Sequence, residues 1–67
     1  MITFMGIDNL VRQFRELKDM EDDSARLYAS ILPDVADPQD RETLRRIITD
    51  EERHSRMVQE IIDLIKS

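Results

Sequence analysis

Residues 44–61 read Leu44-Arg-Arg-Ile47-Ile-Thr-Asp-Glu51-Glu-Arg-His54-Ser-Arg-Met-Val58-Gln-Glu-Ile61, a stretch without glycine or proline. Six residues of this stretch follow one another at alternating spacings of three and four: Leu44, Ile47, Glu51, His54, Val58 and Ile61. This spacing places the row on a single face of an α-helix. Four members of the row are apolar, but Glu51 and His54 stand where apolar residues would continue it. The stretch therefore predicts an amphipathic helix whose buried face contains two polar side chains.

The segment upstream predicts a second helix with the same pattern. Its row contains Phe14, Leu17, Glu21, Ser24, Tyr28 and Ile31. This row also includes a carboxylate, Glu21, among residues that we expect to be buried.

The two helices are separated by the segment Pro33-Asp-Val-Ala-Asp-Pro38, which contains both prolines of the chain and predicts a loop over residues 33–37. Asp37 before Pro38 is typical of a helix start. An aspartate at the N-cap accepts hydrogen bonds from free backbone amides, and a proline at the first helical position has no amide to satisfy. We predict Asp8 as the N-cap of the first helix.

These signals predict one domain over residues 1–67, with the first helix at about 8–32 and the second at about 38–66. The apolar residues within positions 1–7 either extend the first helix or pack over the end of the bundle.

The chain is short for a self-supporting fold, because its 67 residues lie below the roughly 70–80 at which one core reliably holds a scaffold. Disulfides, a metal or self-association usually support such domains, and the absence of cysteine excludes the first. Two antiparallel helices also leave part of each wide apolar face uncovered, whereas a symmetric pair of hairpins covers it. The expected fold class is all-α: an antiparallel two-helix hairpin that dimerises into a four-helix bundle.

The charge argues against two classes of partner. Fifteen acidic and ten basic residues give a net charge of −5, whereas nucleic acids and anionic membrane surfaces require a basic face. The sequence has no apolar run of about 18 residues that would span a bilayer, and its first residues lack the basic region of a secretory signal. We therefore expect a cytoplasmic protein that binds neither nucleic acid nor a membrane.

The three polar residues of the apolar rows are predicted to meet in one layer. Glu51 and His54 share a helical face because they are three residues apart. Glu21 and Glu51 lie roughly 17 and 20 Å from the loop at about 1.5 Å of rise per residue. A dimer doubles the layer to four glutamates and two histidines, the ligand set of a di-iron or di-manganese carboxylate site. Glu52 lies off the shared face.

Other residues near this layer have simpler predicted roles. Asp22 and Asp23 are expected to face solvent rather than to replace Glu21. Met20 and Met57 are expected to pack at the edge of the core rather than to bind metal.

The sequence also resembles a known family. Glu21-Asp-Asp-Ser-Ala25-Arg-Leu-Tyr28 resembles the Glu-x-x-x-Ala-x-x-Tyr pattern in the first helix of rubrerythrins and related ferritin-like proteins. Asp50-Glu-Glu-Arg-His54 is similar to the Asp-Glu-x-Arg-His motif of the wider di-iron carboxylate superfamily. The resemblance covers residues 10–65, half of the usual ferritin-like four-helix domain, as in two-helix chains of the encapsulated-ferritin type.

The resemblance implies roles for six residues. Glu21, Glu51 and His54 would be metal ligands. Asp50 would accept a hydrogen bond from a ligand histidine, in its own chain or a partner's, and Arg53 would balance charge nearby. Tyr28 would be a hydrogen-bond donor or redox-active phenol beside the metal, although a core tyrosine is an equally good interpretation.

The same resemblance implies the chemistry of a ferroxidase or rubrerythrin-like oxidoreductase, which oxidises Fe(II) with O2 or peroxide. The cofactor would be two iron ions per homodimer or higher homo-oligomer, with manganese or zinc as alternatives. Rubrerythrins carry a cysteine-ligated iron centre that supplies electrons. This chain has no cysteine, so reduction would need an external electron donor.

Two other interpretations stay open at this stage. The chain is alternatively a non-catalytic helical-hairpin interaction module whose acidic layer is solvated or paired with Arg53. A related bundle that holds zinc or manganese without oxygen chemistry is the other alternative.

Overall fold

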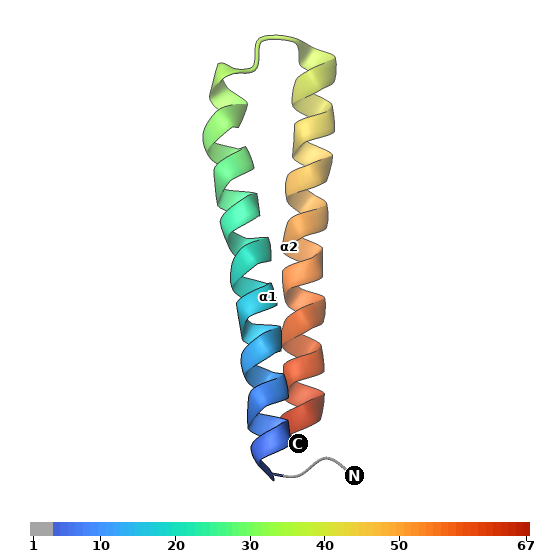
Figure 1. Ribbon diagram of the computed structural model, residues 1–67. Helices are drawn as coiled ribbons and strands as arrows, with labels where there is room; N and C mark the ends of the chain where they lie inside the picture. The colour runs from blue at the N-terminus through green and yellow to red at the C-terminus, as the bar shows by residue number, and fades with distance from the viewer. Residues whose placement is uncertain (1–3) are drawn as a thin grey trace.

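The protein is described here by a computed structural model, which places the backbone of residues 4–67 and the side chains of residues 6–67. Helix α1 (Phe4–Ile31) and helix α2 (Pro38–Lys66) run antiparallel and are joined by a 3-10 turn, η1 (Leu32–Asp34), and a short extended loop (Figure 1). The hairpin measures 52 × 15 × 14 Å. The all-helical, two-helix prediction is confirmed for the described residues, which contain no strand.

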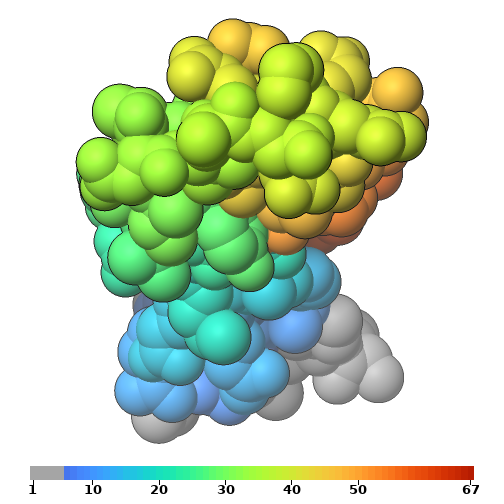
Figure 2. Space-filling model, turned by 90° about the horizontal axis from the view of Figure 1, so that it is seen from above, coloured from blue at the N-terminus to red at the C-terminus, as the bar shows by residue number. Residues whose placement is uncertain are grey.

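The start of α2 follows the predicted capping pattern. The Asp37 carboxylate accepts hydrogen bonds from the backbone amides of Gln39, at 2.7 Å, and Asp40, at 3.2 Å. Pro38 occupies the first turn, where its missing amide leaves no donor unpaired. Viewed from the loop end, η1, the loop and the start of α2 form a continuous layer over the end of the hairpin (Figure 2).

The predicted start of α1 at Asp8 is wrong. The helix begins at Phe4 and continues through Gly6, so Asp8 lies within the helix and caps nothing. Glycine in a helix costs about 1 kcal/mol relative to alanine. Here Ile7 follows it and packs against the core, which favours continuing the helix. The earlier part of the apolar lead, residues 1–3, lies outside the described residues.

The end of α1 also has a local cause. The helix ends at Ile31, directly before Leu32 and Pro33. Leu32 precedes the proline, and the proline ring disfavours α-helical geometry at the residue before it. The chain tightens into η1, and the Val35 amide closes the turn on the Leu32 carbonyl at 3.2 Å.

The apolar core lies at the end of the hairpin that carries the chain termini. Val11, Val58 and Ile62 are buried there, and three partly buried residues pack against them: Ile7, Phe14 and Ile65. No hydrophobic residue of the described loop-side half is fully buried. The core therefore fixes one half of the hairpin, and the other half is held by contacts that include polar ones.

A polar contact joins the two helices next to this core. Buried Ser55 donates a hydrogen bond from its hydroxyl to the Asp22 carboxylate, which also pairs with Lys18 at 3.0 Å. The expectation that Asp22 faces solvent holds only in part: its side chain is 33% exposed, but the rotation of α1 also turns its carboxylate toward Ser55 on α2. Asp23 is exposed as expected and pairs with Arg26 on its own helix.

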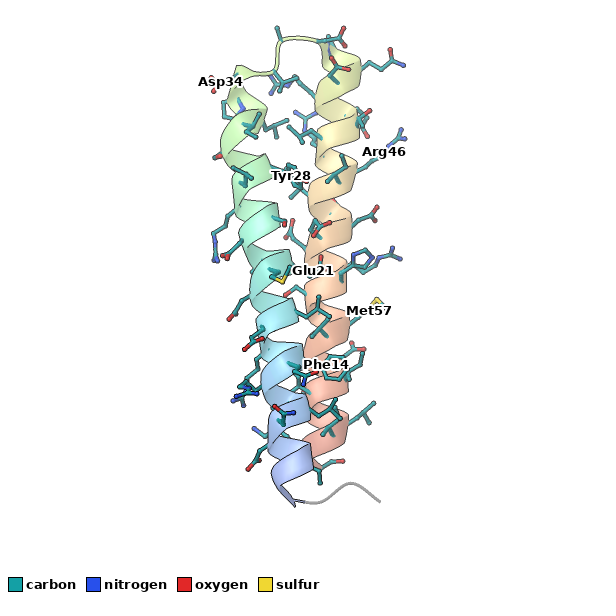
Figure 3. The ribbon with its side chains drawn as sticks, in the orientation of Figure 1. Phe14, Glu21, Tyr28, Asp34, Arg46 and Met57 are labelled. Atoms are coloured by element: carbon teal, nitrogen blue, oxygen red, sulfur yellow. The ribbon has the colours of Figure 1, made fainter. Side chains whose placement is uncertain are left out.

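Many large apolar side chains remain exposed on the single hairpin. They are Leu17, Met20, Leu27, Ile31, Ile47, Met57, Ile61 and Leu64. Met20 and Met57 are 65% and 50% exposed, so within one chain they lie outside the core rather than at its edge. In Figure 3 Met57 projects away from α1. Neither helix in the described part of the chain has the long apolar run that crossing a bilayer requires.

Replacing the α2 cap should lower stability. Asp37→Ala removes the acceptor for two backbone amides and should lower the free energy of unfolding by about 1 kcal/mol, within a range of roughly 0.5–2. Asp37→Asn keeps an acceptor and should retain most of the stability. Urea unfolding followed by circular dichroism measures both. Equal stability of Asp37→Ala and the parent chain would contradict the role of this cap.

Candidate metal centre

Three of the predicted site residues meet between the helices. Glu21 extends from α1, while Glu51 and His54 come from α2, one helical turn apart. Each offers one ligand atom, and these atoms lie within 4.8 Å of one another. This Glu/Glu/His cluster can hold a metal ion, and its side chains are of the oxygen and imidazole types that bind divalent transition metals.

The Glu21 carboxylate is the least satisfied member of the cluster. Its side chain is 21% exposed, and its Oε2 atom is buried without a hydrogen-bond partner among the described residues. The nearest cationic candidate is His54 Nδ1, at 3.7 Å, which is beyond hydrogen-bonding distance. Burying a carboxylate oxygen without a partner is costly. A bound cation would remove this cost.

The neighbouring carboxyl group, Glu51, is a weaker acid than an ordinary glutamate. The pKa of Glu51 is raised above its ordinary value of 4.5, chiefly because a hydrogen bond with Glu21 stabilises its neutral form. Burial and the negative charge of Glu21 act in the same direction, whereas His54 opposes them. A divalent metal ion bound between the two carboxylates would neutralise both.

The cluster is most accessible at His54, whose side chain is 46% exposed, against 21% for Glu21. Residues four or seven apart lie on the same face of a helix. Leu17 and Tyr28 therefore share the face of Glu21, and Ile47 and Ile61 share the face of His54. These four apolar or aromatic residues, which we call the open face, are exposed or half-buried. Figure 3 shows Glu21 and Tyr28 on the side of α1 that faces α2.

The flank opposite the open face carries the Ser55–Asp22–Lys18 contact. The Ser55 hydroxyl and the Lys18 ammonium hold the pKa of Asp22 below its ordinary value. Asp22 is therefore satisfied without a metal and does not join the cluster. Glu52 is exposed and lies outside the cluster as well, which agrees with its predicted position off the shared face.

The remaining predicted site residues lie outside the cluster. Asp50 and Arg53 pair with each other at 3.5 Å, with both side chains about 60% exposed. Arg53 therefore pairs with this surface acid, and no ion pair joins it to Glu21 or Glu51 in the described structure. Tyr28 is half-buried two turns from Glu21 toward the loop. The metal-related roles of Asp50, Arg53 and Tyr28 remain predictions.

Sequence reasoning missed the Ser55–Asp22 hydrogen bond. The available signal was the position of Ser55 beside the apolar row of α2, which predicts that its side chain is buried. A buried hydroxyl requires a polar partner. The sequence does not identify that partner, because the rotation of α1 about its own axis determines which of its side chains faces Ser55.

Comparison of the chain with known proteins finds no matching family model, no matching curated protein and no matching solved structure. The resemblance to ferritin-like proteins therefore rests on the two motifs that contain the cluster residues.

The raised pKa of Glu51 predicts a pH dependence for the metal-free protein. Because folding favours the protonated carboxyl, this stabilisation is complete below about pH 4.5 and is lost as the pH rises through the raised pKa. Asp22 affects stability in a lower pH range. The stabilisation that it contributes is present above about pH 3.8 and is lost as the pH falls through its lowered pKa. Above about pH 4.5, rising pH should therefore lower the stability of the metal-free chain.

The amide variant Glu51→Gln should weaken that dependence, because it resembles the protonated carboxyl at every pH. Thermal unfolding of metal-free protein at a series of pH values above about 4.5 measures the effect. Glu52→Gln, at the neighbouring exposed acid, is the matched control. Identical pH slopes for Glu51→Gln, Glu52→Gln and the parent chain would contradict the raised pKa of Glu51.

Proposed function

We propose that two copies of this chain pair through their open faces and hold two metal ions between them. The observation that carries this proposal is the buried, unpartnered Oε2 atom of Glu21. Glu21 belongs to a cluster in which one ligand atom each from Glu21, Glu51 and His54 lie within 4.8 Å of one another. The site is incomplete in one chain, because two carboxylates and one imidazole provide only half of a dinuclear ligand set.

The open face supports a second copy as the partner. Leu17, Ile47 and Ile61 are about 40% exposed on this face. A two-fold pair would bury these residues against each other and bring the two clusters together in one layer. The resulting four carboxylates would balance the four positive charges of two divalent ions.

Iron is the metal that the motif resemblance favours, and oxidation of Fe(II) by O2 or peroxide is the proposed reaction. Bound iron would supply the redox chemistry of such a site. In this chain Glu21 and Glu51 would hold the ions through their carboxylates, and His54 would add an imidazole ligand. The partly exposed imidazole, 46% accessible in one chain, would be covered by the second copy.

Iron uptake tests the proposal directly. Under anaerobic conditions the protein should bind about two Fe(II) per dimer, the stoichiometry of a shared dinuclear site. Oxygen should then produce near-ultraviolet absorbance of oxidised iron. Glu51→Ala and His54→Ala should abolish both signals, because each removes a ligand.

Glu52→Ala is the matched control, since it removes an adjacent acid outside the cluster. Unchanged iron binding in Glu51→Ala and His54→Ala would refute the site. Elemental analysis of protein purified without added metal identifies the native ion. Stoichiometric zinc or manganese without oxygen-dependent absorbance would retain the site but refute the iron chemistry.

Metal binding should also be coupled to pairing. If two chains share the ligands, the melting temperature should rise with both metal and protein concentration. Sedimentation should show a dimer that weakens when a chelator removes the metal. A melting temperature independent of protein concentration, with a monomer at all metal levels, would contradict the shared site.

A further inference from the structure

A second candidate site lies on the other flank of the hairpin, near the chain termini. A pocket of about 320 Å³ is lined by residues from both helices: Ile7, Asp8, Val11, Arg12, Arg15 and Lys66. Its volume is at the small end of the range for small-molecule sites, roughly 300–1,000 Å³. Three of its six lining residues are cationic, although the chain as a whole has a net charge of −5.

The cations of this pocket differ from most others in the protein. Five of the ten basic residues form ion pairs with acids on their own helix: Lys18, Arg26, Arg45, Arg46 and Arg53. Among the described contacts, Arg12, Arg15 and Lys66 have no carboxylate partner. Arg12 bonds only to the neutral side-chain oxygen of Asn9. The pocket thus brings together three cations for which the described structure shows no ion pair, together with one carboxylate, Asp8.

The pocket lies away from the proposed dimer interface. At 3.6 residues per turn, Arg12 and Arg15 lie on one side of buried Val11, whereas Leu10 and Leu17 lie on the other. Leu17 belongs to the open face. A second copy seated on the open face would therefore not cover the pocket, and the pocket shares no residue with the metal site.

We infer that this pocket binds a phosphate dianion. Three cations and the one carboxylate of Asp8 leave two positive charges, which match the charge of that ion. The guanidinium groups of Arg12 and Arg15 present planar pairs of donors suited to phosphate oxygens, and the Lys66 ammonium adds a point charge from α2. The ligand is either free phosphate or the phosphate group of a small phosphomonoester.

Titration of the ¹⁵N-labelled full chain with inorganic phosphate, at constant ionic strength in chloride, tests this inference. The amide shifts should concentrate at residues 7–15 and 65–67. Arg12→Gln and Arg15→Gln should each weaken binding by about tenfold, the effect of losing one charge-assisted contact. Arg56→Gln is the matched control, because Arg56 also lacks an acid partner in the described structure but lies outside the pocket.

Two further arms separate the sources of binding. Glycerol phosphate that binds more tightly than inorganic phosphate would identify a phosphomonoester as the ligand, whereas equal or weaker binding would identify free phosphate. Repeating the titration after metal removal shows whether the phosphate is bound by a metal ion rather than by this pocket. Shifts that disappear on metal removal, that are unchanged in the two arginine variants, or that fall equally in Arg56→Gln would overturn the inference.

Discussion

A carboxylate oxygen held out of water without a partner is the constraint on which this small protein depends. Glu21 lies between two helices with its Oε2 atom buried. Beside it is a second carboxyl, Glu51, whose pKa is raised, chiefly by hydrogen bonding to Glu21 and also by burial and the charge of Glu21. His54 approaches but does not reach hydrogen-bonding distance. In an apolar row these three residues would weaken the hairpin, since buried charge requires neutralisation. As ligands of a cation, the same residues would join the two helices.

The cluster lies in the part of the hairpin that has the least apolar burial. The buried apolar residues Val11, Val58 and Ile62 lie toward the chain termini, and beyond the Ser55–Asp22 contact no apolar side chain of the described residues is fully buried. Small domains without disulfides need another source of stability. Here the proposed source combines a metal and a partner, because a second copy would cover the open face and complete the ligand set in the same step.

The two flanks of the hairpin have different chemistry. One flank carries the cluster and exposed apolar residues, which suits burial against another helical pair. The other carries the Lys18–Asp22–Ser55 contact and, nearer the termini, the pocket of Arg12, Arg15 and Lys66. Separating the faces in this way would allow assembly on one side and anion binding on the other, without either event blocking the second.

The sequence by itself determined the features that depend on local spacing. The rows at three and four residues predicted both helices, Asp37 and Pro38 predicted the start of α2, and counting from the loop brought Glu21 level with Glu51 and His54. The start of α1 was mispredicted, because packing of Ile7 outweighs the helix-breaking tendency of Gly6. Only the tertiary structure decided that Asp22 meets Ser55, that Asp50 pairs with Arg53 at the surface, and that unpaired cations converge near the termini. The Asp50–Arg53 pair lies within α2, but the contacts between the helices depend on how far each helix is rotated about its axis, and packing between the two helices sets that rotation.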